Sequence, residues 1–353
     1  MGNRIAIIGA GAVGCYAGAY MVQAGEDVTF VDWWPENVEA IRTGLRISHL
    51  KDVPEFTVQG RALHLTELQQ VSREKPFDIA FICVKSYDTA WATQMVAQYL
   101  SPNGYCVSLQ NCMNEATIAG IVGWGRTLGA VASSITVELS APGQVKRASG
   151  KGGAAHTVYR VGEVHGRITD RAREVARLTA LSDSTLVTPN LWGERWTKLV
   201  ANVMQNGMSA ATGLISRDIL LDDRLRHFTA RLGSEAIRTG QALGYALEEV
   251  LHIDPEIIAR AGEGDAAALA DYDQHRLVEA RKPGGGAHRP SMGQDMMKGR
   301  RTEIEAMNGY IVQQAEPLGL ATPANAALTA LVQRVERGEI AADPRHIHEL
   351  RLN

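Results

Sequence analysis

A lysine and two asparagines recur at four-residue intervals between Trp196 and Asn206. Lys198, Asn202 and Asn206 occupy positions i, i+4 and i+8. On an α-helix, each step of four residues drifts by only about 40°, so these side chains are expected along one helix stripe. An ammonium can donate a proton, and asparagine amides can hold polar oxygens. The spacing indicates either the wall of a polar cleft or a solvated helix face.

A second polar segment follows further along the chain, at residues 289–295 and 300–309. Ser291 could hold a ligand oxygen, but Ser291 with Gln294 also fits the pattern of a helix capping box. Glu303 could orient a reacting group, and it is equally compatible with an exposed helix acid. These residue types alone leave both interpretations of the segment open.

A glycine-rich turn near the N-terminus is typical of dinucleotide binding. The sequence Gly9-Ala-Gly11-Ala-Val-Gly14 follows an apolar strand predicted over 5–8 and opens a helix predicted over 12–24. Glycines allow a tight turn, close approach of backbone to a pyrophosphate, and helix–strand packing, while the helix N-terminus faces the negative charge. The predicted cofactor-binding residues are Gly9, Ala10, Gly11, Ala12, Val13 and Gly14.

Asp32 ends the second predicted strand, 23 residues after Gly9. A carboxylate there can accept hydrogen bonds from the adenosine ribose hydroxyls, and it repels the 2′-phosphate of NADP. The following residues are Trp33, Trp34 and Pro35, with no arginine before Arg42. The charge argument predicts a preference for NAD(H), although Asp32 could also be a turn residue.

The elements that must carry these residues divide the chain into two halves. Apolar strands over 5–8, 27–31, 77–84 and 105–109 alternate with helical patterns, which indicates a parallel sheet covered on both faces. An extended segment at 130–137 could lengthen that sheet. The expected fold is α/β, with an N-terminal Rossmann-type doubly wound sheet followed by an all-helical C-terminal domain.

The pattern of the sequence changes after Pro189, from alternating strands and helices to helices. Residues 191–336 read as almost continuously helical, with breaks at glycine-rich positions. We therefore predict a dinucleotide-binding domain over 1–189 and a helical domain over 190–353. By analogy with known proteins of this organisation, the helical domain is expected to bind the substrate and to form a homodimer.

Composition excludes several classes of protein. The 36 Lys and Arg nearly balance 39 Asp and Glu, giving a net charge of −3, which argues against a nucleic-acid binder or a polybasic membrane protein. The four cysteines form no CxxC pair, and the neighbouring His346 and His348 lack an acidic partner pattern, so no metal site is expected. A cytoplasmic protein without a membrane anchor is the expectation.

Taken together, the motifs resemble the ketopantoate reductase (2-dehydropantoate 2-reductase) family. The matching segments span residues 9–309 in the family's order. They are Gly9-Ala-Gly11-Ala-Val-Gly14, Val84-Lys85-Ser86, Gln110-Asn111, Trp196-x-Lys198-x-x-x-Asn202-x-x-x-Asn206, Pro290-Ser291-Met292-x-Gln294-Asp295 and Thr302-Glu303-Ile304-x-x-x-Asn308-Gly309.

The resemblance implies hydride transfer from NAD(P)H to a 2-keto acid, in pantothenate biosynthesis or a related reaction. It implies that Lys198 is the general acid that protonates the ketone oxygen. Lys85 and Asn111 would lie beside the nicotinamide and reach the substrate. Glu303 would fix Lys198 or the substrate hydroxyl. The residues implied to hold the substrate are Asn202, Asn206 and Ser291.

The sequence departs from the family pattern at two places. The family usually has glycine after the Asn111 position, where this chain has Cys112. The family typically uses NADP(H), with an arginine near the end of the second strand, whereas this chain has Asp32. Two other hypotheses stay open: a β-hydroxyacid or opine-like dehydrogenase acting on another substrate, and a non-catalytic dinucleotide-sensing protein.

Overall fold

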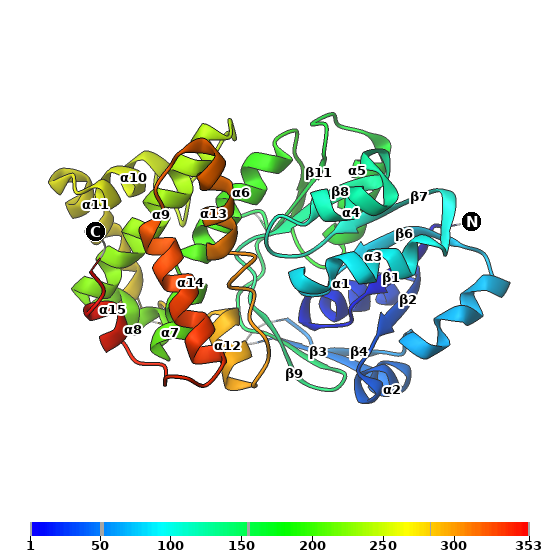
Figure 1. The fold of residues 1–353 in the computed structure, drawn as a ribbon. Helices are drawn as coiled ribbons and strands as arrows, with labels where there is room; N and C mark the ends of the chain where they lie inside the picture. Colours follow the sequence, from blue (N-terminus) through cyan, green and yellow to red (C-terminus); the bar gives the residue numbers. More distant parts are fainter. Residues whose placement is uncertain (1, 50–52, 154–155, 283, 352–353) are drawn as a thin grey trace. The chain divides into compact units, whose positions relative to one another are not determined.

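The alternating strands and helices of the first half build a central sheet in the computed structural model, which describes residues 2–49, 53–153, 156–282 and 284–351. Two compact units result, Met1–Leu191 and Trp192–Asn353, so the chain divides two residues after the boundary expected at 189 (Figure 1). Each unit is described separately below.

The main sheet of the first unit has the strand order β12-β11-β8-β7-β6-β1-β2-β5. Neighbouring strands run parallel except β8 and β11, which are antiparallel. Its strands are β1 (Arg4–Ile8), β2 (Asp27–Asp32), β5 (Arg61–His64), β6 (Phe77–Ile82), β7 (Leu100–Ser108), β8 (Thr127–Ala132), β11 (Tyr159–Glu163) and β12 (Thr185–Val187).

Side-chain alternation along the strands fills a core on each face of this sheet. In β1, Ile5 and Ile7 belong to one buried cluster, whereas Ala6 and Ile8 belong to another. Helices α1 and α5 pack on the first face, and α3 and α4 pack on the second. These helices are α1 (Ala12–Gln23), α3 (Thr89–Ala97), α4 (Glu115–Val122) and α5 (Asp170–Ala180). The predicted doubly wound arrangement is confirmed.

The expectation that residues 130–137 extend the main sheet is wrong for the end of that segment. Strand β8 ends at Ala132, and Ser134 adopts a left-handed conformation with φ of 55°. The turn redirects the chain because left-handed residues do not continue an extended strand. The chain then enters a separate sheet of order β4-β3-β10-β9. Its strands are β3 (Leu45–His49), β4 (Phe56–Val58), β9 (Val137–Ala141) and β10 (Gln144–Arg147).

The remaining elements of the first unit connect these strands. Helix α2 (Pro35–Gly44) begins with a proline in its first turn, where the fixed φ of proline suits a helix. Short 3₁₀ helices complete the connections: η1 (Leu65–Arg73), η2 (Ser86–Asp88) and η3 (Trp124–Arg126).

The second unit is helical, as predicted. Helix α9 contacts α8, α10, α11, α13, α14 and α15, so it forms the centre of this unit. The helices are α6 (Leu191–Val203), α7 (Asn206–Thr212), α8 (Ser216–Leu221), α9 (Asp223–Ala242), α10 (Pro255–Glu263), α11 (Ala266–Arg281), α12 (Ser291–Met297), α13 (Asn308–Ala315), η4 (Glu316–Leu318), α14 (Pro323–Glu336) and α15 (Arg345–His348).

Candidate active site

The glycine turn between β1 and α1 has the geometry that its sequence predicts. Gly9 has φ of +93°, and a Cβ atom there would lie 2.8 Å from the backbone nitrogen of Val84. A Cβ on Gly14 would lie 2.4 Å from the Gly9 carbonyl oxygen. In contrast, a Cβ on Gly11 would meet no atom within 4 Å. Two glycines are therefore required by packing, while Gly11 borders open space.

This turn fits the pyrophosphate of a dinucleotide. Helix α1 begins at Ala12 with Gly11 as its N-cap, and no side chain caps it and no acidic residue lies in its first turn. The first backbone N–H groups, including those of Ala12 and Val13, therefore remain available to an anion at the positive end of the helix. The pyrophosphate would approach the protein backbone through the open space beside Gly11.

Asp32 lies at the end of β2 with its carboxylate turned toward this turn. Its Oδ2 accepts a hydrogen bond from the Ala10 N–H at 2.6 Å, and its Oδ1 accepts one from the Trp34 N–H at 2.8 Å. Burial raises the pKa of the Asp32 carboxyl, and these backbone N–H groups act in the opposite direction. Asp32 thus ties the glycine turn to the end of β2, a role that the sequence argument did not include.

Lys85 and Asn111 follow the carboxyl ends of β6 and β7. The Cys83 N–H donates to the Ile8 carbonyl at 2.8 Å, and the Leu109 N–H donates to the Ile82 carbonyl at 3.0 Å. These bonds align the ends of β1, β6 and β7 at one edge of the sheet. Ligands of open α/β sheets bind at that edge.

Two further side chains hold the segments that carry Lys85 and Asn111. The Gln110 amide donates to the Val84 carbonyl at 2.8 Å, and the Asn114 amide donates to the Asn111 carbonyl at 2.7 Å. Sequence reasoning noted Gln110 only as part of a motif and did not consider Asn114. Gln110 belongs to the Gln110-Asn111 motif and Asn114 lies just after it, and this proximity to the motif was the signal that the sequence offered for both residues.

In the second unit, a buried tryptophan fixes the rotation of α6. Trp196 is fully buried, and its indole N–H donates to the Ala236 carbonyl of α9 at 2.9 Å. A Cβ on Gly240 would lie 2.2 Å from the indole nitrogen, so only glycine at 240 leaves room for this ring. Leu199 and Val203 are buried along the same side of the helix. Lys198 therefore points away from the side that packs on α9.

Lys198 is half-buried, and its ammonium makes no hydrogen bond or ion pair with any residue that the structure describes. Burial, reinforced by the positive charge of Arg195, lowers the pKa of Lys198 to about 8. Arg195 lies three residues earlier on α6 and is 1% exposed. Sequence reasoning missed Arg195, although its spacing from Lys198 was visible.

Asn202 lies one helical turn beyond Lys198, as the spacing predicts. Its side chain is 8% exposed, and its Nδ2 atom is buried without a hydrogen-bond partner among the described residues. A buried donor left unpaired costs about 1–3 kcal/mol. The Asn202 amide is therefore a candidate donor to a ligand oxygen.

Asn206 is not on the same continuous helix, so the prediction of one uninterrupted three-residue stripe is wrong. Helix α6 ends at Val203 and α7 begins at Asn206, after a turn at Met204 and Gln205. The break lets α7 pack closely at Gly207, where a Cβ would lie 2.8 Å from the Leu328 side chain. Close packing of this glycine outweighs the intrinsic tendency of the segment to continue as one helix.

The break brings Asn206 to Ser291. The Ser291 hydroxyl donates to Asn206 Oδ1 at 3.1 Å, and the Met292 N–H approaches the same oxygen at 3.4 Å. Because Oδ1 accepts on this side, the amide NH₂ group of Asn206 faces the other way. Ser291 is the first residue of α12, so the two predicted substrate-binding residues lie together.

Glu303 lies between α12 and α13 in a segment that is not a regular helix. It is 5% exposed, and its backbone carbonyl accepts from the Met307 N–H at 3.0 Å. Thr302, immediately before it, is also buried. The interpretation of Glu303 as an exposed helix acid is therefore excluded.

Comparison with known proteins agrees with both halves of the chain. The family model "Ketopantoate reductase PanE/ApbA" matches residues 5–157, and "Ketopantoate reductase PanE/ApbA C terminal" matches residues 190–336. The chain belongs to the ketopantoate reductase family. It is therefore an NAD(P)-dependent oxidoreductase of the 2-dehydropantoate 2-reductase type.

Individual relatives cover nearly the whole chain. A 2-dehydropantoate 2-reductase of Archaeoglobus fulgidus is 29% identical over 340 residues, which are 95% of this chain and 99% of the relative. The crystal structure of 2-dehydropantoate 2-reductase from Geobacter metallireducens GS-15 has a TM-score of 0.75 at 25% identity, covering 94% and 99% of the two chains. A D-mandelate dehydrogenase with NADH and anilino(oxo)acetate shares the fold, with a TM-score of 0.75 at 23% identity and coverage of 95% and 99%.

Cys112 occupies a position whose backbone conformation favours glycine, the residue that the family resemblance implies there. Cys112 has φ of 67°, in the left-handed region that glycine adopts without strain. Its side chain is 2% exposed. The loop beside Asn111 therefore keeps the glycine conformation with a cysteine in it.

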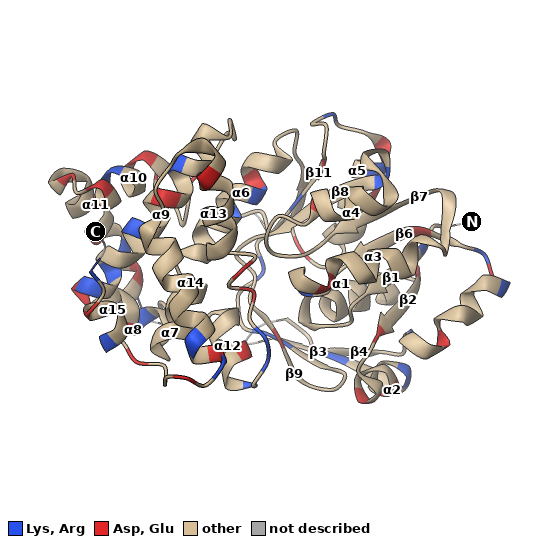
Figure 2. Ribbon diagram, in the orientation of Figure 1, with Lys and Arg blue, Asp and Glu red and all other residues tan. Residues whose placement is uncertain are grey.

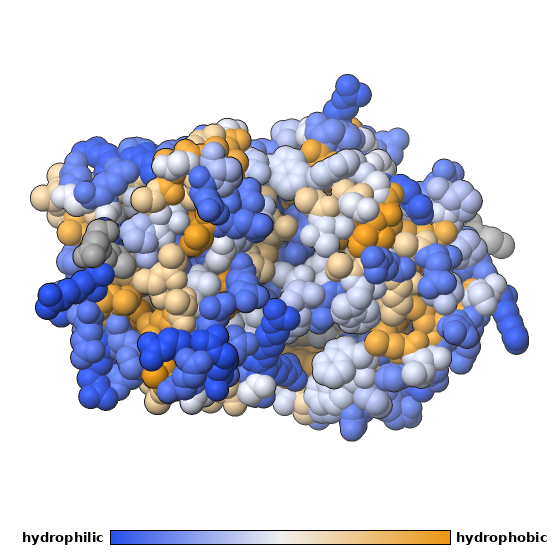
Figure 3. Space-filling model, viewed as in Figure 1, coloured by the Kyte–Doolittle hydropathy of each residue, from blue (hydrophilic) through white to orange (hydrophobic). Residues whose placement is uncertain are grey.

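The surface of this member of the family agrees with the composition. Figure 2 shows Lys and Arg interspersed with Asp and Glu along the helices of the second unit. On the face drawn in Figure 3, apolar residues gather in small patches between larger hydrophilic areas. Across the described ranges, no helix has the length and apolar character needed to span a bilayer. No group of three or more His, Cys, Asp or Glu in those ranges could hold a metal ion.

Proposed function

We propose that this ketopantoate reductase reduces the ketone of 2-dehydropantoate, or of a closely related 2-keto acid, with Lys198 as the general acid. The observation that carries the proposal is a partly buried ammonium with a lowered pKa, one turn from an amide donor that has no hydrogen-bond partner within the described ranges. The first unit is assigned to dinucleotide binding and the second to substrate binding.

The electrostatics of Lys198 suit proton donation near neutral pH. With a pKa of about 8, roughly 90% of the group is protonated at pH 7, and it loses its proton far more readily than an exposed lysine. A bound reduced nicotinamide supplies the hydride that reaches the carbonyl carbon. Lys198 Nζ gives its proton to the ketone oxygen, which completes the hydroxyl and leaves a neutral amine that solvent reprotonates.

The other predicted site residues are assigned to the rest of the substrate. The Asn202 amide donates to a substrate oxygen, which removes the cost of its unpaired buried N–H. Asn206, oriented by Ser291, presents its NH₂ group to the carboxylate or hydroxyl. We assign Glu303 to orienting Lys198 or the substrate hydroxyl, and Lys85 and Asn111 to the nicotinamide side of the substrate.

The cofactor is proposed to be NADH. Asp32 places a carboxylate at the end of β2, where it would repel a 2′-phosphate. The glycine turn, with open space at Gly11 and an uncapped α1, would hold the pyrophosphate. Self-association into a homodimer stays a proposal that sedimentation of the purified protein tests directly.

The test follows oxidation of NADH and of NADPH by the purified protein with 2-dehydropantoate and a panel of other 2-keto acids. We expect turnover with 2-dehydropantoate and a higher kcat/KM with NADH. Turnover only with 2-keto acids that are not close relatives of 2-dehydropantoate overturns the assigned substrate. Dinucleotide binding without turnover anywhere in the panel overturns the catalytic assignment and favours a sensing protein.

A further inference from the structure

The segment that carries Glu303 has no regular secondary structure of its own to hold it. It connects α12, which ends at Met297, with α13, which begins at Asn308. An irregular segment keeps a fixed conformation only when other elements satisfy its backbone and side-chain polar groups. The contacts on either side of Glu303 therefore help to fix its backbone, from which its carboxylate extends.

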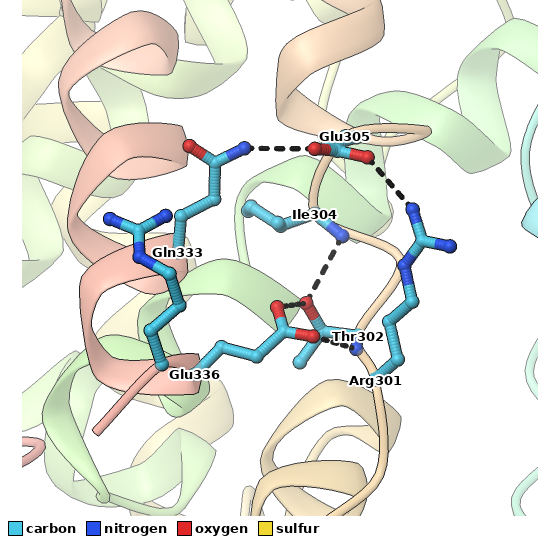
Figure 4. A pocket seen from close by; sticks show the side chains of 7 residues that line it. Arg301, Thr302, Ile304, Glu305, Gln333 and Glu336 are labelled. Carbon is cyan, nitrogen blue, oxygen red and sulfur yellow. Dashed lines mark hydrogen bonds and ion pairs between the residues drawn. The ribbon is translucent and has the colours of Figure 1, made fainter. Parts of the chain in front are cut away.

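Helix α14 holds the segment immediately before Glu303. The carboxylate of Glu336, the last residue of α14, accepts from the Thr302 N–H at 3.0 Å and from the Thr302 hydroxyl at 2.9 Å. One turn earlier, the Gln333 amide donates to Glu305 Oε1 at 3.0 Å. Figure 4 shows both contacts in the wall of a surface pocket of about 200 Å³. The residues on both sides of Glu303 are thus bonded to α14.

The first turn of the same helix holds the end of the segment after Glu303. The fully buried Asn308 donates to Asn325 Oδ1 at 2.9 Å and to the Val203 carbonyl of α6 at 3.2 Å. Asn325 in turn donates to the Glu235 carboxylate at 2.7 Å. Burial raises the pKa of Glu235, and its bonds to the start of α14 oppose that shift. This contact network ties the segment to the end of α6, the helix that carries Lys198.

We propose that Glu336 is a positioning residue that fixes Glu303 for the reduction through its paired hydrogen bonds to Thr302. The inference rests on the role assigned to Glu303 under the proposed function. Two bonds from one carboxylate to the N–H and hydroxyl of a single residue restrict both its backbone and its side-chain torsion. Because Asn308 is held at the other end, displacement of Thr302 moves Glu303 rather than being absorbed along the segment.

The first test compares Glu336→Ala with Glu336→Gln. A glutamine retains an oxygen to accept from the Thr302 N–H, and its NH₂ group can donate to the Thr302 hydroxyl. We expect Glu336→Ala to lower kcat about 10- to 100-fold, with the Kd for NADH unchanged, because a misplacement near 1 Å at a reacting centre has that effect. Glu336→Gln should keep kcat within about twofold of the wild type on the same positioning argument.

Matched variants separate positioning from folding and from charge. Glu339→Ala removes a nearby carboxylate that pairs with Arg337 instead, and it should leave kcat unchanged. Thr302→Val removes only the hydroxyl of the pair, with little change in volume, and should lower kcat, whereas Thr302→Ser should not. If Glu336→Gln loses as much activity as Glu336→Ala, the effect is electrostatic and the proposal is overturned.

A double-mutant cycle with Glu303→Asp shows whether Glu336 acts through Glu303. We expect Glu336→Ala to have a much smaller effect in the Glu303→Asp background, because that carboxylate is already displaced by one methylene. Equal effects in both backgrounds, or full activity of Glu336→Ala, overturn the inference. Full activity of Glu303→Asp and Glu303→Gln instead overturns the role of Glu303 in the proposed function. This outcome is distinguishable from failure of the Glu336 inference, because it depends on the Glu303 variants alone.

Discussion

Asp32 Oδ2 and the backbone nitrogen of Ala10 lie 2.6 Å apart, so the acid at the end of β2 is hydrogen-bonded to the glycine turn itself. In the proposed site this carboxylate orders the turn and would also accept hydrogen bonds from the adenosine ribose. The two roles have different readouts, because loss of the first weakens binding of both nucleotides and loss of the second changes the preference between them.

Substitution of Asp32 should change both nucleotide affinity and nucleotide preference. Asp32→Ala removes the repulsion of a 2′-phosphate, so the ratio of kcat/KM with NADPH to that with NADH should rise by about tenfold or more. Affinity for both nucleotides should fall, because the Ala10 N–H loses its partner. The measurement is initial-rate kinetics with both nucleotides. A wild-type enzyme that already prefers NADPH contradicts the assignment.

Lys198 should control the alkaline limb of the pH profile. Only the protonated amine can act as general acid, so kcat/KM for reduction should be level below pH 8 and fall tenfold per unit above it. Arg195→Met removes a positive charge that lowers this pKa, and the limb should move to higher pH. Arg195→Lys is the matched control that keeps the charge. A profile that shows no limb between pH 7 and 10 contradicts the assignment.

Lys198→Met should abolish turnover while stabilising the fold. We expect kcat to fall by about 10²–10⁴, the usual contribution of a general acid. The lowered pKa means that the folded chain disfavours the charged amine, by up to about 3 kcal/mol at pH 7. The wild type should regain this stability between pH 8 and 10.5. In that range the folded lysine is already neutral, and the unfolded lysine loses its proton as the pH rises. Urea unfolding at pH 7 and 10.5 measures the free energy of unfolding of the wild type and of Lys198→Met. A difference between the two proteins that is the same at both pH values contradicts the prediction.

Cys112→Gly should cost about 1 kcal/mol less stability than the same change at a buried strand position. Relief of the left-handed backbone at Cys112 contributes about 1 kcal/mol, which offsets the added freedom of glycine in the unfolded chain and leaves only the loss of the buried side chain. Cys106→Gly is the control, because Cys106 is equally buried but lies in strand β7. That change should cost about 2 kcal/mol or more. Similar losses in both variants, measured by urea unfolding, would show that strain at Cys112 is negligible.

Local patterns were sufficient to predict the dinucleotide-binding half of the fold. The run from β1 through the glycine turn to α1 is encoded within about twenty residues, and its strand alternation and glycine spacing follow directly from backbone sterics. The second sheet was not predictable in this way, because β3 and β10 pair across about a hundred residues of sequence. Spacing placed Lys198 and Asn202 correctly on one helix.

Long-range packing accounts for what the sequence analysis did not predict in the second unit. The break before Asn206 depends on the fit of Gly207 against Leu328, which no local propensity encodes. Glu336 looks like an ordinary helix-end acid in the sequence, and only its contact with Thr302 indicates another role. Asn308 was visible within a motif, but its partner Asn325 was not.

The interruption between α6 and α7 has an evolutionary consequence. Lys198 and the Asn206–Ser291 pair lie on different helices, so substitutions in α7 and α12 can alter the pair without rotating the lysine. We therefore expect this scaffold to tolerate changes in the acid that it accepts while the proposed proton donor keeps its place.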